Sequence, residues 1–292
     1  MRSDGTRGHA LFDAVRGGTE RLDSSSAQEG RTNEGNISFD ADGFSVTSSH
    51  PTVNDSGDSA VAWNWLAGGT AVSNTDGSIT SQVSANQTAG FSIVSYVADG
   101  TNTSTVGHGL PTEPKMVIQK DRSAASDWLV YTDLVDGSDD YLLLNSTAAK
   151  GNAAGGATAT VFNSWDRTSG NDMIAYCFAE VESYSKIGSY TGNGSTDGTF
   201  VHCGFRPAFV MLKRSNSAED WYIADATRDT ENDAGLALFP NTSGAEASYS
   251  SALDLLSNGF KLRNSGGLRN GSGDTYIFLA FASAPFKSAN AR

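Results

Sequence analysis

Acidic residues that could act as a general acid and a general base gather at one place in the chain, Asp136-Gly137-Ser138-Asp139-Asp140. Hydrolysis of a polysaccharide needs two carboxyl groups roughly 5 to 9.5 Å apart across a groove. The repeated units described below carry no matching group, and Gly and Ser between acids are typical of an exposed turn. We therefore expect a turn here, no catalytic residue and no enzyme activity.

Residues that bind metal ions show no spacing that a metal site requires. The four histidines and two cysteines fit none of the zinc patterns: His9, His50, His108, His202, Cys177 and Cys203. Both cysteines are expected to be buried free thiols, with a disulfide or metal role as the alternative. The Ser-Gly-Asp and Ser-Gly-Asn turns offer too few oxygen atoms for Ca²⁺ and are expected to be turns only. The sequence thus predicts no metal and no cofactor.

These Ser-Gly turns belong to a pattern that occurs three times, each time before an apolar stretch. The copies are Ser56-Gly57-Asp58 before Val61, Trp63 and Trp65; Ser169-Gly170-Asn171 before Ile174, Tyr176 and Phe178; and Ser272-Gly273-Asp274 before Ile277, Leu279 and Phe281. Because side chains alternate along a strand, the three apolar residues of each copy share a face. A pair of Trp side chains could stack on a sugar, but Tyr and Leu at the matching position favour core packing.

The second and third copies share a longer early portion that the first copy lacks. Pro114, Val117, Lys120 and Trp128 recur at identical spacing as Pro207, Val210, Lys213 and Trp221. The first copy shares only the later half, in which Asp13–Arg16 matches Asp225–Arg228. Met1 falls where Lys120 to Arg122 would lie. The chain therefore begins partway through a repeat: either it was trimmed from a longer protein, or another segment supplies the missing strands.

Short apolar runs separated by Gly, Asn and Asp turns predict an all-β fold of tandem antiparallel β-sandwich or jelly-roll-like units, the first one incomplete. A strand is expected at Val61–Leu66, and Ser251–Leu256 is the one candidate for a helical turn or two. The expected division is a partial first repeat at 1–69, a Ser/Thr/Gly-rich linker or run of weak edge strands at 70–90, a second repeat at 91–184, a third at 185–286, and a C-terminal tail at 287–292.

Composition excludes several classes of function. A net charge of −13 without a basic stripe argues against nucleic-acid binding, which requires clustered Lys and Arg. The start of the chain lacks the apolar stretch of a signal peptide, and no apolar run reaches a membrane-spanning length, so we expect no membrane insertion. A duplicated scaffold without matching catalytic groups favours an extended binding or structural protein over an enzyme.

Several longer motifs carry a resemblance to a known family. They are the stretches at 68–81, 91–96, 106–117, 175–180, 188–194 and 285–292. With these motifs the chain resembles the repeated β domains of unknown function in tail-fibre-like virion proteins of marine tailed bacteriophages. The resemblance implies a virion protein assembled in the host cytoplasm, forming a homotrimer, contacting other virion proteins and taking part in host adsorption.

We therefore expect a tail fibre or distal tail appendage that binds host-surface glycans or outer-membrane proteins through several weak sites at once. Loops 98–105 and 192–199 are the expected contact regions, because loops carry binding while the sheets fix their positions. No individual ligand-binding residue is assigned. The alternatives are a capsid decoration, fibre or baseplate protein without a receptor, and a polysaccharide depolymerase.

Overall fold

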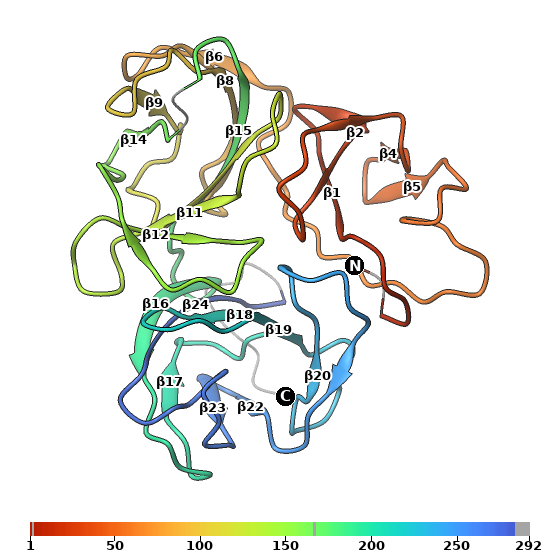
Figure 1. Cartoon of the computed structure of the whole chain (residues 1–292), viewed down its shortest axis with the longest axis vertical. Helices are drawn as coiled ribbons and strands as arrows, with labels where there is room; N and C mark the ends of the chain where they lie inside the picture. The colour runs from red at the N-terminus through yellow and green to blue at the C-terminus, as the bar shows by residue number, and fades with distance from the viewer. Residues whose placement is uncertain (2, 166–167, 284–292) are drawn as a thin grey trace.

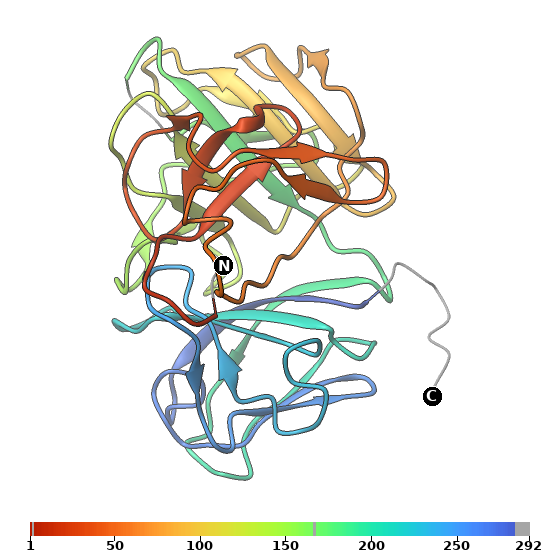
Figure 2. The same cartoon turned by 90° about the vertical axis from the view of Figure 1, so that its right-hand side faces the viewer.

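The computed structural model describes residue 1 and residues 3–165 and 168–283, and every helix or strand assigned within them is a β-strand. The strands pair antiparallel in several sheets, which confirms the all-β fold class. No helix in this part of the chain is long and apolar enough to cross a membrane. The tail at 287–292 and the end of the third repeat at 284–286 lie outside the described residues. Figure 1 shows three lobes around a common centre, and Figure 2 shows the third lobe below the other two.

The first repeat contains two small sheets, with strand orders β1-β2-β3 and β4-β5. Their strands are β1 (Ala10–Asp13), β2 (Gly17–Asp23), β3 (Arg31–Thr32), β4 (Ile37–Phe39) and β5 (Phe44–Val46). Residues 61–66, which follow the first Ser-Gly-Asp turn, run beside the start of the chain: the Met1 amino group donates to Val61 O (2.7 Å) and Val61 N donates to Met1 O (2.8 Å).

The second repeat is built on an eight-stranded sheet of order β13-β12-β11-β10-β15-β8-β7-β6, with the pair β14-β9 beside it. Its strands are β6 (Val72–Asn74), β7 (Ser81–Asn86), β8 (Phe91–Val97), β9 (Thr105–Gly107), β10 (Met116–Asp121), β11 (Leu129–Thr132), β12 (Asp140–Leu143), β13 (Gly151–Asn152), β14 (Val161–Asn163) and β15 (Asp172–Phe178).

The third repeat packs a four-stranded sheet, β16-β24-β18-β19, against a three-stranded sheet, β17-β23-β22, with a small pair β20-β21. Its strands are β16 (Ser185–Thr191), β17 (Phe200–His202), β18 (Phe209–Arg214), β19 (Trp221–Asp225), β20 (Leu236–Ala237), β21 (Ala247–Ser248), β22 (Leu253–Leu256), β23 (Gly259–Leu262) and β24 (Thr275–Phe281). Two facing sheets with an apolar layer between them form a β-sandwich.

The three repeats close into a ring. The same backbone hydrogen bond occurs at each junction, from the first repeat to the second, the second to the third and the third to the first: Gly30 N to Arg122 O (2.9 Å), Lys150 N to Ser215 O (2.8 Å) and Glu246 N to Ser3 O (2.9 Å). Met1 pairs with Val61 as Lys120 pairs with Ile174 and Lys213 with Ile277. The repeats are therefore related by an approximate threefold axis, and the extended array expected from the sequence is wrong.

A shared apolar core lies at the centre of this ring, with residues from all three repeats. At its middle, the last aromatic residue of each repeated pattern contacts the other two. The ring centroids are 6.2 Å apart for Trp65 and Phe178, 5.6 Å for Trp65 and Phe281, and 6.0 Å for Phe178 and Phe281. Separate outer cores fill the second and third repeats. The prediction that Trp65 packs in a core is confirmed, and that core joins the repeats.

Three expectations about local structure need correction. Residues 61–66 are assigned to no strand, because β24 pairs along its length with both β16 and β18, whereas in the described first repeat Val61 pairs only with Met1. Residues 70–90 do not form a linker: they contain β6 and β7, and β6 is the edge strand that the alternative expectation described. Ser251–Leu256 forms no helical turn, because the alternation of apolar residues places its second half in β22.

Candidate functional site

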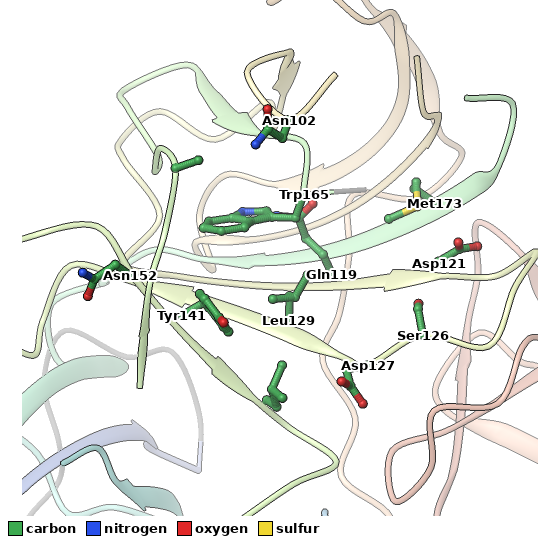
Figure 3. Close-up of a pocket in the computed structure, with 12 residues that line it drawn as sticks. Asn102, Gln119, Asp121, Ser126, Asp127, Leu129, Tyr141, Asn152, Trp165 and Met173 are labelled. Atoms are coloured by element: carbon green, nitrogen blue, oxygen red, sulfur yellow. The ribbon is translucent and has the colours of Figure 1, made fainter. Parts of the chain in front are cut away.

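A hollow of about 450 Å³ lies on the outer face of the sheet in the second repeat (Figure 3). Its floor comes from β10, β11 and β12, whose residues Gln119, Leu129 and Tyr141 point outward, away from the shared core. Trp165, two residues beyond the end of β14, stands over this floor. Concave sites of this kind, with an aromatic wall and a few polar groups, are typical of small-molecule binding sites.

Aromatic contacts hold Trp165 in place. Its ring centroid lies 5.9 Å from that of Tyr141 and 6.4 Å from that of Tyr131. The Tyr131 hydroxyl donates to Asp139 Oδ1 (3.0 Å), and burial raises the pKa of this hydroxyl. Trp165 itself is partly exposed, so one region of its ring is anchored while another faces the hollow. A fixed aromatic ring loses little conformational entropy when a ligand stacks on it.

The polar groups of the hollow form two sets: a fixed set, whose side chains are held by hydrogen bonds within the protein, and an exposed set. Gln119 is fixed, because its Oε1 accepts from the Tyr96 hydroxyl (2.8 Å) and its Nε2 donates to Asn163 O (3.1 Å). Asp121 is buried and its carboxylate caps the following turn, accepting from Ser123 N at 2.8 Å.

The exposed set comprises Asp127 and Asn152, with Asn102 partly exposed beside them. Asp127 Oδ1 accepts from Asn145 Nδ2 at 2.8 Å, which orients the carboxylate. Amide and carboxylate groups beside an aromatic ring present donors and acceptors around an apolar face. This combination suits a polyhydroxylated ligand, whose C–H faces stack on the ring while its hydroxyl groups bond the rim.

The corresponding place in the third repeat is filled. The strand registers match Leu129 of the hollow to Tyr222 and Met173 to Tyr276, and both tyrosines are fully buried. The Arg269 guanidinium group lies 4.7 Å from the Tyr222 ring centre and packs over it. The second repeat therefore has the hollow and the third repeat does not. The shared fold alone does not create it.

The expected contact loops have different surroundings. Loop 98–105 reaches the hollow, because Asn102 lies on its rim. Loop 192–199 contributes no residue to that hollow. Its Asp197 forms an ion pair with Lys261 (2.6 Å), and Asn193 bonds the side chain of the buried Asn270.

The acidic cluster is a turn held by one lysine. Lys150 Nζ lies 2.5 Å from Asp136 Oδ2 and 2.8 Å from Asp140 Oδ2. The Lys150 ammonium group holds the pKa of the Asp136 carboxyl well below its usual range, and the carboxylates in turn raise the pKa of Lys150. Asp139 accepts from Tyr131 as described above. Asp136 and Asp139 lie in the turn that the sequence predicted, whereas Asp140 is buried at the start of β12.

Other residues singled out in the sequence lie apart from the hollow. Gly57, Gly170 and Gly273 all have positive φ (87°, 91° and 77°), which confirms the three turns and explains why each copy has Gly there. Burial raises the pKa of both Cys177 and Cys203 to about 12, as expected of buried thiols. No group of three His, Cys, Asp or Glu residues in the described ranges could hold a metal ion.

Sequence reasoning missed the hollow. Trp165, Tyr141, Asn152 and Asp127 are not among the repeated positions singled out above. The available signal was a difference between aligned copies: small or flexible Leu129 and Met173 stand where the third copy has two Tyr residues. Only the register of the strands shows that these two substitutions face one space.

Comparison with known proteins gives a family without a function. Residues 1–285 match a family described as a domain of unknown function, DUF7483. No curated protein and no solved protein structure matches the chain.

Proposed function

The chain belongs to the DUF7483 family, whose function is unknown, and we propose that it is a glycan-binding domain of a phage virion appendage that takes part in host adsorption. The observation that carries the glycan assignment is the hollow of the second repeat, with Trp165 and Tyr141 beside exposed carboxylate and amide groups. The resemblance of the sequence to tail-fibre-like proteins supports the virion assignment. Placement on the tail is part of the proposal.

The geometry supports a weak and selective site. A hollow of about 450 Å³ accommodates a few sugar residues at most, and its rim is open to a longer chain. One aromatic platform with three or four polar partners gives modest affinity. Several copies on one particle, through a homotrimer and repeated appendages, raise the overall affinity by roughly 10²–10⁴-fold without further contacts. Trimer assembly is proposed with the function, and the native mass of the purified chain tests it.

Replacement of Trp165 by Ala tests the assignment. We expect Trp165→Ala to weaken binding to the recognised surface polysaccharide by about tenfold or more, since truncation of an anchoring Trp typically costs about 2 kcal/mol or more. Trp165 also packs against the outer core of the second repeat, so the variant should melt at a lower temperature, and binding is compared well below the transition of both chains. The measurement is binding of the purified chain to a panel of host lipopolysaccharides and capsular polysaccharides.

A matched control uses an exposed aromatic residue far from the hollow. Phe200 in β17 of the third repeat is 43 % exposed, and Phe200→Ala should leave polysaccharide binding unchanged. Equal binding by the Trp165→Ala variant and the parent chain would remove the hollow as the glycan site. Reducing ends released from the bound polysaccharide would show that the chain is a depolymerase.

One observation favours a structural role as the second candidate. Apolar side chains of the first repeat are exposed, including Phe39 (45 %) and Leu66 (79 %), and such surfaces are usually covered in an assembly. A capsid decoration or baseplate component would bury them against other virion proteins. Antibody labelling of intact particles under the electron microscope separates the two roles: label at the distal tail supports adsorption, and label on the capsid supports decoration.

A further inference from the structure

Independently of the proposed glycan site, we propose that the first repeat binds a polypeptide segment with the two-strand pattern of β16 and β17. The segment would add to the open side of this repeat and complete its sandwich. The occupant is thus a β segment of the same repeat type that lies outside the described residues of this chain. Three observations define its position. They are an unpaired strand edge, a phenylalanine that is exposed although its counterparts in the other repeats are buried, and an apolar patch around this phenylalanine.

The first observation is an open strand edge. In the third repeat, β16 pairs with β24 along its whole length, from Ser185 opposite Phe281 to Thr191 opposite Thr275. In the second repeat, β8 pairs with β15 in the same way. Residues 61–65 of the first repeat are the counterpart of β24 and β15. Among the described residues, no strand pairs with 62–65, so this edge offers its backbone groups to an added strand.

The second observation is one phenylalanine position in three environments. The registers equate Phe44 in β5 with Phe162 in β14 and Phe260 in β23, which pair with Val106 and Val201 of the neighbouring strands. Phe162 is 1 % exposed and Phe260 is 0 % exposed, whereas Phe44 is 36 % exposed. The same residue type is therefore kept at a place where the described first repeat covers it only in part.

The cover is the same in both complete repeats. A tyrosine of the added strand stands over this phenylalanine: the ring centroids of Tyr96 and Phe162 are 6.1 Å apart, and those of Tyr190 and Phe260 are also 6.1 Å apart. The tyrosines belong to β8 and β16, which have no counterpart among the described residues of the first repeat. A segment with this pattern would therefore fill the same place over Phe44.

The third observation is the patch around Phe44. Phe39 is 45 % exposed and Val46 is 39 % exposed, whereas their counterparts in the third repeat, Leu255 and Leu262, are 2 % and 0 % exposed. Figure 1 places β4 and β5 on the outer side of the first lobe, away from the shared core. An exposed apolar patch next to an open strand edge matches a strand added with its side chains facing the patch.

A β segment fits these features better than a small ligand. Only an extended backbone can bond along the edge at 62–65 while its alternate side chains cover Phe44. In the third repeat, two short strands are sufficient for this: β16 supplies Ile187 and Tyr190, and β17 supplies Val201, all buried. The junction hydrogen bonds to the other repeats do not involve this side, so it can be completed without opening the ring.

A graft tests the proposal on the full chain. A second copy of residues 183–212 is fused in front of Met1, so that Met1 follows Leu212 as Lys213 does in the third repeat. We expect the melting temperature to rise by about 5 °C or more. Amide hydrogen exchange at residues 44–46 and 62–65 should slow at least tenfold in the grafted chain.

The control is the same graft with Tyr190→Asp and Val201→Asp in the added copy only, which should give neither effect. If the graft fails to fold, a synthetic peptide of residues 183–206 is added to the intact chain, and slower exchange at 62–65 supports the proposal. Unchanged exchange at 62–65 with either form of the segment overturns it. A stable dimer of the unmodified chain with these amides already protected also overturns it, because a second copy would then be the occupant.

Discussion

At the scale of single residues, one contact between neighbouring repeats is made by Trp at two junctions and by His at the third. Trp128 Nε1 donates to Asp23 O (3.0 Å) in the first repeat, and Trp221 Nε1 donates to Leu143 O (2.9 Å) in the second. His9 occupies the corresponding place in the first repeat and faces the backbone of Phe239 in the third. The backbone of Phe239 and Thr242 lies close enough to the imidazole to oppose the lowering of its pKa by burial, but neither ring nitrogen reaches the geometry of a full hydrogen bond. The third junction therefore lacks the indole N–H contact that the other two share.

His9 should make the protein sensitive to acid. Burial lowers the pKa of His9 from 6.5 to about 4, so between these values the unfolded chain binds more protons than the folded chain. The free energy of unfolding consequently falls as pH drops from 6.5 to 4, and this contribution is complete above 6.5. It amounts to at most about 3.5 kcal/mol, given roughly 1.4 kcal/mol per pKa unit.

We therefore expect His9→Gln to unfold with a flatter pH dependence than the parent chain between pH 6.5 and 4. Urea unfolding at several pH values measures the difference in free energy of unfolding between the two proteins. The contribution of carboxylates that titrate in both proteins cancels in this difference. His202 is exposed, so His202→Gln should follow the parent curve. A parallel shift of the His9→Gln curve at all pH values would show that the imidazole does not titrate in this window.

At the scale of elements, the repeated apolar stretch has one structure in the second and third repeats and another in the first. In β15 and β24 it lies within a sheet, whereas residues 61–66 reach the shared core as an extended segment. Trp63 packs edge-on against Phe209 of the third repeat, with 5.5 Å between ring centroids, and the Arg228 guanidinium group lies 5.7 Å from the Trp63 ring. Aromatic packing thus stands in for some of the strand pairing that this segment lacks.

We expect the double substitution Trp63→Ala with Trp65→Ala to abolish cooperative unfolding. Each loss of a packed Trp costs roughly 3–5 kcal/mol, and the sum approaches the 5–15 kcal/mol stability of a typical domain. Leu66 is 79 % exposed, so Leu66→Ala should unfold like the parent chain in thermal melts followed by circular dichroism. An intact melt with loss of binding to host cells would instead identify the two Trp side chains as a sugar platform.

Two buried lysines also connect elements of neighbouring repeats. Lys213 Nζ donates to Thr147 O (3.2 Å) across the junction to the second repeat, and Lys120 Nζ lies 3.4 Å from Ala27 O across the junction to the first. Burial lowers the pKa of Lys213 to about 8. Each ammonium group also donates to the next residue of its own repeat, Lys120 to Asp121 O and Lys213 to Arg214 O (both 2.6 Å), so the recurring Lys serves its own strand end and the junction together.

At the scale of the whole molecule, ring closure predicts how the chain unfolds. The three repeats share one core, so removal of one repeat exposes apolar surface on the other two. We expect a single calorimetric transition with equal calorimetric and van't Hoff enthalpies. An open array of repeats can unfold repeat by repeat, because each repeat contacts only its neighbours. Two or more separate transitions in scanning calorimetry would contradict a shared core.

The sequence by itself determined the local features. Spacing showed three copies of one β unit, Gly residues marked the turns, and the first copy aligned only with the later half of the other two. These properties depend on periodicity and on residue types with special backbone freedom, which act over a few residues. The same signals favoured a strand at Val61–Leu66 and left 70–90 open between a linker and edge strands, because pairing depends on a partner elsewhere in the chain.

Only the tertiary structure decided how the copies meet. The contact of Trp65 with Phe178 and Phe281 joins residues that are distant in sequence, and no local pattern distinguishes a closed ring from an open array. The hollow beside Trp165 likewise depends on which side chains of several strands face one space. Side-chain volume at Leu129 and Met173 leaves this space open in the second repeat, whereas Tyr222 and Tyr276 fill it in the third.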